Sequence, residues 1–185
     1  MMLPIRRLFK ITELEIHRQI ENFQKQYIGL GEEARQFDQD GDTMHDPVVY
    51  RNQLERQRIE VEIENLSNLL KSIEYIAAED LLAETTIQLG HKVELQVRYP
   101  DGESETMAVV LGTEVDSYIL GKRNDLETRI ISETSPLGKA IRGRKIGEEF
   151  ATQAPGGNLH LKILEFKVSF LLEDTSLSQD WKGSR

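Results

Sequence analysis

Apolar residues in the first part of the chain recur at alternating spacings of three and four. The upstream set consists of Phe9, Ile16, Ile20, Phe23, Tyr27, Leu30, Ala34 and Phe37, with polar Thr12 interrupting its first step. A repeat of this kind forms the seam along which one helix packs against another. The pattern therefore predicts a long helix over residues 9–37.

The same alternation returns further along the chain. Its members are Ile59, Ile63, Leu66, Leu70, Ile73 and Ala77, and the phase extends backward to Val49 through polar Asn52 and Arg56. About ten residues separate the two segments, so the economical arrangement is an antiparallel helical hairpin. At a rise of about 1.5 Å per residue, a helix of about 29 residues would carry its tip roughly 43 Å from its base.

From His91 onward the apolar period changes from helical to two. Val93, Leu95, Val97 and Tyr99 alternate with polar residues, and Pro100-Asp101-Gly102 is a turn signal before a returning strand over 106–111. Further short strands are expected at 118–120, 128–131, 150–153 and 159–168. Alternation of this kind is typical of a sheet with one buried face.

One short helix is indicated inside the sheet region. Ser135 can serve as its N-cap, Pro136 fits the first helical position and Gly143 can end it. Its apolar residues would pack on the sheet, which leaves a basic group outward or just beyond the helix: Lys139, Arg142, Arg144 and Lys145.

Together these patterns predict the α+β fold class, with an N-terminal antiparallel coiled-coil hairpin followed by an α+β domain. We expect the hairpin over residues 1–80, the domain over 81–172 and a mobile tail over 173–185.

Composition narrows the functional classes. The 185 residues carry a formal net charge of −9, which argues against general nucleic-acid binding through a basic surface. The chain has no cysteine, which removes disulfides and thiolate metal sites, and it has no apolar run of membrane-spanning length. The expected protein is a cytoplasmic monomer with no membrane contact.

Four acids are concentrated in the turn between the two helical segments: Asp38, Asp40, Asp42 and Asp46. No Lys or Arg lies between Arg35 and Arg51, so mutual repulsion destabilises the turn unless a cation is met. Asp46 before Pro47 is also an ordinary helix start, and capping and metal delivery both stay open at this position. An EF-hand is excluded because Thr43 and Val49 occupy the required glycine and glutamate positions.

Three motifs carry a family likeness. Residues 135–150 read Ser-Pro-Leu-Gly-Lys-Ala-Ile-Arg-Gly-Arg-Lys-Ile-Gly-Glu-Glu-Phe, and Ala-Pro-Gly-Gly at 154–157 and Leu-Lys-Ile-Leu-Glu at 161–165 follow. This pattern resembles the carboxy-terminal signature of the bacterial Gre transcript-cleavage factors. The likeness extends to Glu33-Ala34-Arg35, Gly41-Asp42, Tyr50 and the run from Arg58 to Leu69.

The resemblance implies a carboxy-terminal domain similar to FKBP-type prolyl isomerases that docks on RNA polymerase. It also implies that the hairpin enters the secondary channel, where tip carboxylates help hold a second Mg²⁺ and promote cleavage of backtracked RNA. Such a factor is an accessory to the polymerase active site and not itself an enzyme. By the family pattern, Asp42 and Asp46 are the catalytic acids, and all four tip aspartates are candidate metal ligands.

The tip departs from the family pattern. Cleavage factors place the second acid, normally Glu, three residues after the first, whereas this chain has Asp42-Thr-Met-His-Asp46. Gre-like paralogues that inhibit the polymerase carry several tip acids, which this chain resembles. Inhibition without cleavage is therefore the alternative function, and an FKBP-like prolyl isomerase or chaperone is a third.

Two basic groups have a general and a specific interpretation. Arg51, Arg56 and Arg58 on the second helix form either a solvated face or a local RNA contact. Lys139, Arg142, Arg144 and Lys145 are either plain surface or a contact with an acidic part of the polymerase.

Overall fold

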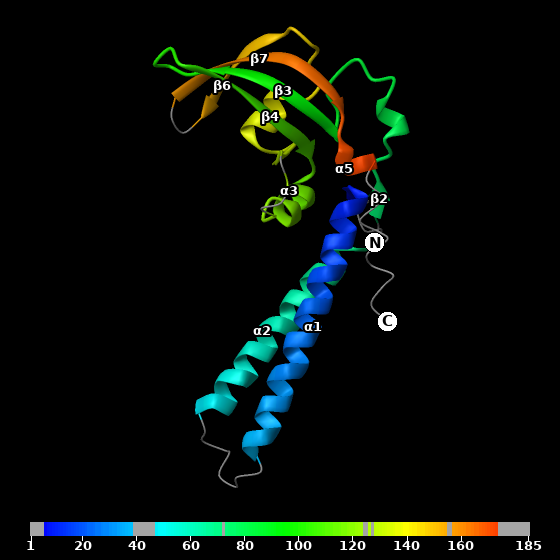
Figure 1. Cartoon of the computed structure of the whole chain (residues 1–185), viewed down its shortest axis with the longest axis vertical. Helices are drawn as coiled ribbons and strands as arrows, with labels where there is room; N and C mark the ends of the chain where they lie inside the picture. The colour runs from blue at the N-terminus through cyan, green and yellow to red at the C-terminus, as the bar shows by residue number, and fades with distance from the viewer. Residues whose placement is uncertain are drawn as a thin grey trace, which may run out of the picture. The chain divides into compact units, whose positions relative to one another are not determined.

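A computed structural model gives the structure of the protein and describes residues 6–38, 47–71, 73–123, 126, 128–154 and 157–173 (Figure 1). The chain divides into two compact units. Residues 15–71 form one, here called the hairpin unit, and the residues before 15 and after 71 form the other, here called the sheet unit. The units thus separate at two points in the sequence, whereas the sequence prediction placed a single boundary at residue 80.

The hairpin unit consists of helix α2 (Pro47–Leu69) and of helix α1 (Lys10–Asp38) from residue 15 onward, and the two helices lie side by side (Figure 1). Their contacts show that the helices run antiparallel. The Tyr27 hydroxyl donates to the Glu60 carboxylate at 2.6 Å, and Gly31, one turn further along α1, lies beside Arg56, one turn earlier on α2. The predicted antiparallel helical hairpin is confirmed.

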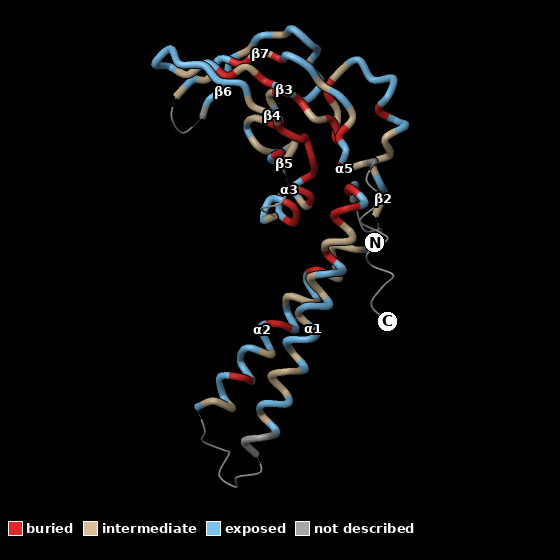
Figure 2. Tube along the Cα trace, in the orientation of Figure 1, coloured by how far each residue is buried: buried red, intermediate tan, exposed pale blue. Residues whose placement is uncertain are grey.

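The predicted heptad seam is the less exposed stripe of both helices. Ile16, Ile59 and Leu66 are 0%, 2% and 5% exposed, and other apolar seam positions such as Phe23 and Ile63 are half-buried. Figure 2 shows these buried positions spaced along helices that are otherwise half-buried or exposed. The polar seam position Asn52 is also buried, at 4% exposure. Burial of the apolar stripe is the main source of stability for such a helix pair.

The second helix is shorter than predicted. It ends at Leu69, because the Leu70 and Lys71 amides bond to the carbonyls of residues three positions earlier. Ile73, expected in the seam, instead lies in strand β2 (Ile73–Tyr75), which pairs in parallel with β1 (Arg6–Leu8). The β-branched and aromatic side chains of this stretch favour a strand, and a neighbouring strand is available to pair with it.

A five-stranded sheet forms the body of the sheet unit, with the order β5-β4-β3-β7-β6 (Figure 1). Its strands are β3 (His91–Arg98), β4 (Ser104–Gly112), β5 (Arg129–Ser132), β6 (Glu149–Ala154) and β7 (Gly157–Val168). Neighbouring strands are antiparallel except for β4 and β5. The α+β fold class is confirmed, and these strands correspond to the predicted ones apart from the one at 118–120.

One face of the sheet carries the core. Val93, Leu95 and Val97 alternate inward on β3 with at most 1% exposure and pack with Leu161 and Ile163 of β7. Helix α4 (Pro136–Ile141) adds Ile141 to the same cluster. The alternation read from the sequence therefore identified the inward residues of β3.

The strand expected at 118–120 is wrong, since these residues end helix α3 (Glu114–Leu120). Thr113 caps this helix. Its hydroxyl accepts from the Asp116 amide, and the Asp116 carboxylate accepts from the Thr113 amide, which makes a reciprocal capping box. The chain is further ordered by a short 3-10 turn (Glu79–Leu81) and by helix α5 (Phe170–Glu173).

Residues 174–185, most of the predicted tail, lie outside the described residues. Among the helices that the structure describes, none combines the length and the apolar character needed to cross a membrane.

Candidate functional site

The acidic turn joins two helix ends that the structure describes. Helix α1 ends at Asp38 and α2 begins at Pro47, so eight residues connect them. Asp40, Asp42 and Asp46 lie outside the described residues, as does the side chain of Asp38. The roles predicted for these four aspartates therefore stay predictions, and Pro47 occupies the first helical position as expected.

The start of α1 is held by a buried carboxylate. Asp116 is fully buried, and its Oδ1 accepts from the Phe9 amide at 3.0 Å and from the Thr12 hydroxyl. Its Oδ2 accepts from the Thr113 amide at 3.0 Å and from the Thr113 hydroxyl at 2.7 Å. Four donors thus satisfy one buried acid, and the polar interruption at Thr12 belongs to this cluster.

The three arginines of α2 have different surroundings. Arg51 is exposed, and Arg58 is exposed and lies 3.9 Å from Glu55. The Arg56 guanidinium instead stacks over the Tyr27 ring at 4.1 Å from its centre. Arg56 is therefore held between the helices, whereas Arg51 and Arg58 face solvent. Their predicted RNA contact stays a prediction.

The Ser-Pro-Leu-Gly motif has a local structural cause. The Ser135 hydroxyl accepts from the Gly138 amide at 3.0 Å and donates to the Ser132 carbonyl at 2.6 Å. A Cβ at Gly138 would lie 2.0 Å from that same carbonyl oxygen. Because a backbone oxygen cannot be rotated away as a side chain can, only glycine fits at this position.

The basic group beside α4 is partly engaged within the chain. Arg142 pairs with Glu133, and Arg144 donates to the Ala140 carbonyl at 2.7 Å and to Glu148 at 3.1 Å. The Arg144 guanidinium also lies 4.0 Å from the centre of a phenylalanine ring, that of Phe150. Lys139 and Lys145 have exposed side chains. Docking through these residues stays a prediction.

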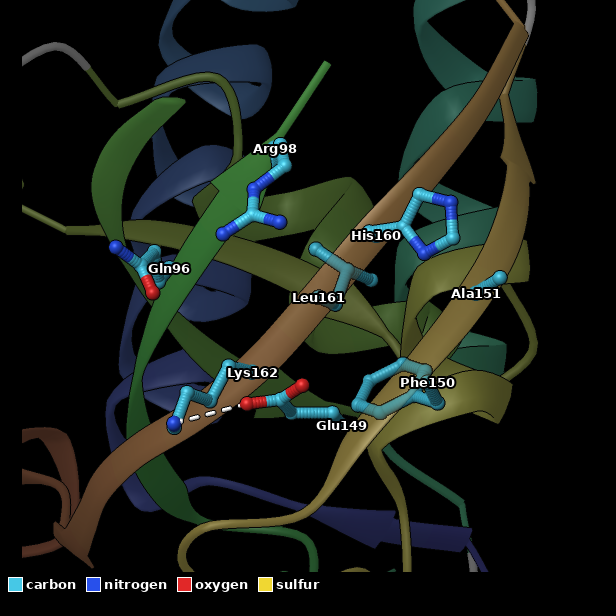
Figure 3. Close-up of a pocket in the computed structure, with 8 residues that line it drawn as sticks. All are labelled: Gln96, Arg98, Glu149, Phe150, Ala151, His160, Leu161 and Lys162. Atoms are coloured by element: carbon cyan, nitrogen blue, oxygen red, sulfur yellow. Dashed lines mark ion pairs between the residues drawn. The ribbon is translucent and has the colours of Figure 1, made fainter. Parts of the chain in front are cut away.

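A shallow cavity on the outer face of the sheet was not found from the sequence. It measures about 330 Å³, and its lining comes from β3, β6 and β7 (Figure 3): Gln96, Arg98, Glu149, Phe150, Ala151, His160, Leu161 and Lys162. Glu149 and Lys162 form an ion pair at 2.9 Å. The hydrogen bond from Lys162, its charge and the charge of Arg98 lower the pKa of Glu149.

Six of the lining residues, all except the core residues Phe150 and Leu161, alternate with core residues along their strands. The period-two pattern therefore predicts that these six face away from the core. What the sequence lacked was the strand register, which sets Ala151 opposite His160 and His160 opposite Arg98.

The described residues contain no group of three or more His, Asp or Glu side chains that could hold a metal ion. The tip aspartates offer the hard carboxylate oxygens that Mg²⁺ prefers, and their role as ligands stays a prediction.

Comparison with known proteins gives a family match that lies within the sheet unit. Residues 82–168 match the family described as transcription elongation factor, GreA/GreB, carboxy-terminal domain. The transcription elongation factor GreA of Geobacillus kaustophilus is 34% identical over 113 residues, which are 61% of this chain and 65% of the relative. GreA of Bacillus subtilis is 32% identical over 111 residues, covering 60% and 63%. The chain thus spans slightly less than two thirds of these relatives.

A solved structure of similar extent is the GreA factor homolog 1 of Thermus thermophilus. It is 20% identical, covers 88% of this chain and 99% of its own, and has a TM-score of 0.38. The alignment covers most of both chains, but the two structures superpose poorly.

Proposed function

We propose that this chain, which belongs to the Gre/GreA-type family of transcription elongation factors, binds RNA polymerase and carries its acidic turn into the secondary channel. The match of residues 82–168 to the family supports the elongation-factor role. The observation that carries the channel role is the antiparallel pair α1 and α2, whose connection holds three of the four tip aspartates, with Asp38 at the end of α1.

In this proposal the tip aspartates act on the catalytic Mg²⁺ of the polymerase to stimulate cleavage of backtracked RNA. When bound, Mg²⁺ supplies charge that stabilises the attacking and leaving oxygens of the phosphodiester. One or two carboxylates suffice on the factor side, because Mg²⁺ keeps several waters and takes other ligands from its surroundings. Asp42 and Asp46 would supply them, with Asp38 and Asp40 adding negative charge.

A transcript-cleavage experiment tests this function. Stalled elongation complexes with 3′-labelled RNA are incubated with the protein over a range of Mg²⁺ concentrations. We expect release of short 3′ fragments that Asp42→Asn and Asp46→Asn each reduce at least tenfold. The matched control is Asp80→Asn, an exposed aspartate of the sheet unit, which should cleave as the wild type does. Absence of fragments at every Mg²⁺ concentration would exclude cleavage.

Inhibition without cleavage is the second candidate, and the spacing of Asp42 and Asp46 favours it. A tip that occupies the channel would slow nucleotide addition in the same complexes. We expect elongation to recover when Asp38, Asp40, Asp42 and Asp46 are all changed to Asn, because the effect on Mg²⁺ needs their charge. Persistent inhibition by this variant, with binding to the polymerase retained, would refute an electrostatic mechanism.

The basic residues supply the contact part of the proposal. Lys139 and Lys145 would face an acidic part of the polymerase, and Arg51 and Arg58 would lie near RNA. Changing each pair to Glu separates the two roles: the first pair should weaken binding to the free polymerase, and the second should act only in complexes that contain a transcript.

A further inference from the structure

Strand β6 is an unprotected edge of the sheet. It is last in the strand order and pairs only with β7 among the described residues. Natural proteins protect long edges with Lys, Pro or bulges, because unpaired amides and carbonyls accept a further strand. Strand β6 begins with the charged residue Glu149, and beyond it residues 150–154 read Phe-Ala-Thr-Gln-Ala, with no charge, proline or register shift.

The ladder fixes which backbone groups of β6 point outward. Ile163 of β7 bonds toward β6, since it donates to the Glu148 carbonyl at 3.0 Å and accepts from the Gly147 amide at 2.8 Å. Hydrogen-bonded positions alternate along an antiparallel pair, so Ala151 and Gln153 direct their amides and carbonyls away from β7. These two residues are exposed.

A row of side chains runs inward from this edge across the outer face. Ala151 lies opposite His160, and His160 lies opposite Arg98. Figure 3 shows His160 between the other two, in the cavity of about 330 Å³. The next row holds the ion pair of Glu149 and Lys162, so its charges are balanced. The Ala151 row holds two basic side chains and no acid.

We propose that β6 binds an extended peptide segment by strand addition, and that His160 and Arg98 hold an Asp or Glu side chain of that segment. A residue paired with Ala151 places its side chain on the same face as Ala151 and in the same row. The alanine methyl leaves the space above it open, so a carboxylate reaches over it toward His160. The Arg98 guanidinium behind His160 adds a planar pair of donors that suits carboxylates.

The chemistry of the site favours a peptide over a nucleic acid. What the edge offers is a line of backbone donors and acceptors, which an extended peptide satisfies. The only aromatic carbocycle in the cavity lining is Phe150, which packs against the core and lies under Arg144, so it offers no free face for a base. The net charge of −9 further disfavours RNA.

This site goes beyond the proposed function. It uses neither the tip aspartates nor the basic residues beside α4, so peptide binding can succeed or fail independently of cleavage, inhibition or polymerase docking.

The probe is a fluorescein-labelled octapeptide, Ser-Val-Thr-Val-Glu-Val-Thr-Ser, with blocked ends, and binding to the full chain is followed by fluorescence anisotropy. We expect the same peptide with Lys in place of Glu to bind about tenfold more weakly, because it meets His160 and Arg98 with the wrong charge. Arg98→Glu should weaken binding of the Glu peptide by a similar factor. The matched control is Arg129→Glu on β5, an exposed arginine on the opposite edge strand, which should leave binding unchanged.

Amide hydrogen exchange measured by NMR tests the strand addition itself. Saturating peptide should slow exchange of the Ala151 and Gln153 amides about tenfold or more, while amides on the opposite edge strand β5 keep their rates. Circular dichroism of each variant confirms that the sheet is intact.

Four results would overturn the proposal. The first is no binding of the Glu peptide at about 1 mM. The second is equal weakening by Arg98→Glu and Arg129→Glu, which would indicate unspecific charge attraction. The third is unchanged exchange at Ala151 and Gln153, which would indicate a carboxylate contact without strand pairing, and the fourth is displacement of the peptide by an eight-nucleotide uridine RNA that binds more tightly, which would indicate an RNA site.

Discussion

The Thr12 hydroxyl donates a hydrogen bond to the buried Asp116 carboxylate, across 104 residues of sequence. This contact places the first turn of α1 against the capped start of α3, within the sheet unit. The same carboxylate accepts from the amides of Phe9 and Thr113. A single acid therefore fixes the start of the long helix within the sheet unit, and this contact explains why polar Thr12 interrupts the first step of the heptad seam.

Thr12 and Asp116 are expected to be energetically coupled. Thr12→Val should lower the free energy of unfolding by about 1.5 kcal/mol, and Asp116→Ala by about 3 kcal/mol, because it leaves buried amides without an acceptor. The double variant should lose about 1 kcal/mol less than the sum. Urea unfolding followed by circular dichroism measures all three. Thr106→Val, at an exposed position of β4, is the matched control, and strict additivity would contradict the coupling.

Gly138 should not tolerate a side chain. Gly138→Ala places a methyl group against the Ser132 carbonyl, and we expect a loss of about 3 kcal/mol in stability. The control is Gly29→Ala in α1, where a Cβ meets nothing within 4 Å and helix propensity should add up to about 1 kcal/mol. Thermal unfolding compares the two variants, and changes of the same sign would contradict the steric explanation.

Asn52 is expected to weaken the helix pair. It is 4% exposed at a seam position, and its Nδ2 finds no hydrogen-bond acceptor among the described residues. Asn52→Leu removes the unsatisfied amide and continues the apolar seam, so the melting temperature should rise, with a gain of about 1–2 kcal/mol. Gln53→Leu, at an exposed neighbouring position, should change stability by less than about 0.5 kcal/mol. A destabilised Asn52→Leu variant would show that the amide has a stabilising partner.

His91 predicts a pH dependence of stability. It is 1% exposed, its Nδ1 accepts from the Gln88 amide at 2.9 Å, and burial lowers its pKa against smaller opposing effects of Leu81 and Glu84. The unfolded chain binds the proton more readily than the folded one. The contribution of His91 to the free energy of unfolding is therefore fully present above about pH 6.5 and is lost as the pH drops toward the lowered pKa. The wild type should therefore lose more stability than His91→Asn between about pH 7.5 and 5.5.

Melting temperatures at several pH values measure this difference. His160→Asn, which changes an exposed histidine, should follow the wild-type curve. Parallel curves for the wild type and His91→Asn would contradict a role for His91.

The sequence predicted most of the fold because its patterns are local. Heptad spacing identified both helices, and period-two alternation identified the inward residues of β3. The prediction failed at 118–120 because a short apolar run suits a helix or a strand equally. The capping residues Thr113 and Asp116 were the signal that would have decided it. The helix prediction failed at Ile73 because pairing of this stretch with strand β1 overrode the heptad spacing.

The site was predicted unevenly for the same reason. The acidic residues of the turn and the basic residues beside α4 can be read directly from the sequence. The contacts of Arg56 with Tyr27 and of Arg144 with Phe150 depend instead on which secondary-structure elements pack together. The cavity at Arg98 and His160 depends on register between strands separated by more than fifty residues. No local pattern encodes that register.

The sequence by itself determined most of the helical and extended stretches, the faces that they bury and the place where acidic residues are concentrated, since these follow from the spacing of side chains along one element. Only the tertiary structure decided that Thr12 meets Asp116, that Arg56 is held in the seam and that Ala151 opens a row leading to Arg98. Each of these depends on packing and pairing between distant segments, where the free energy of the whole fold selects the partner.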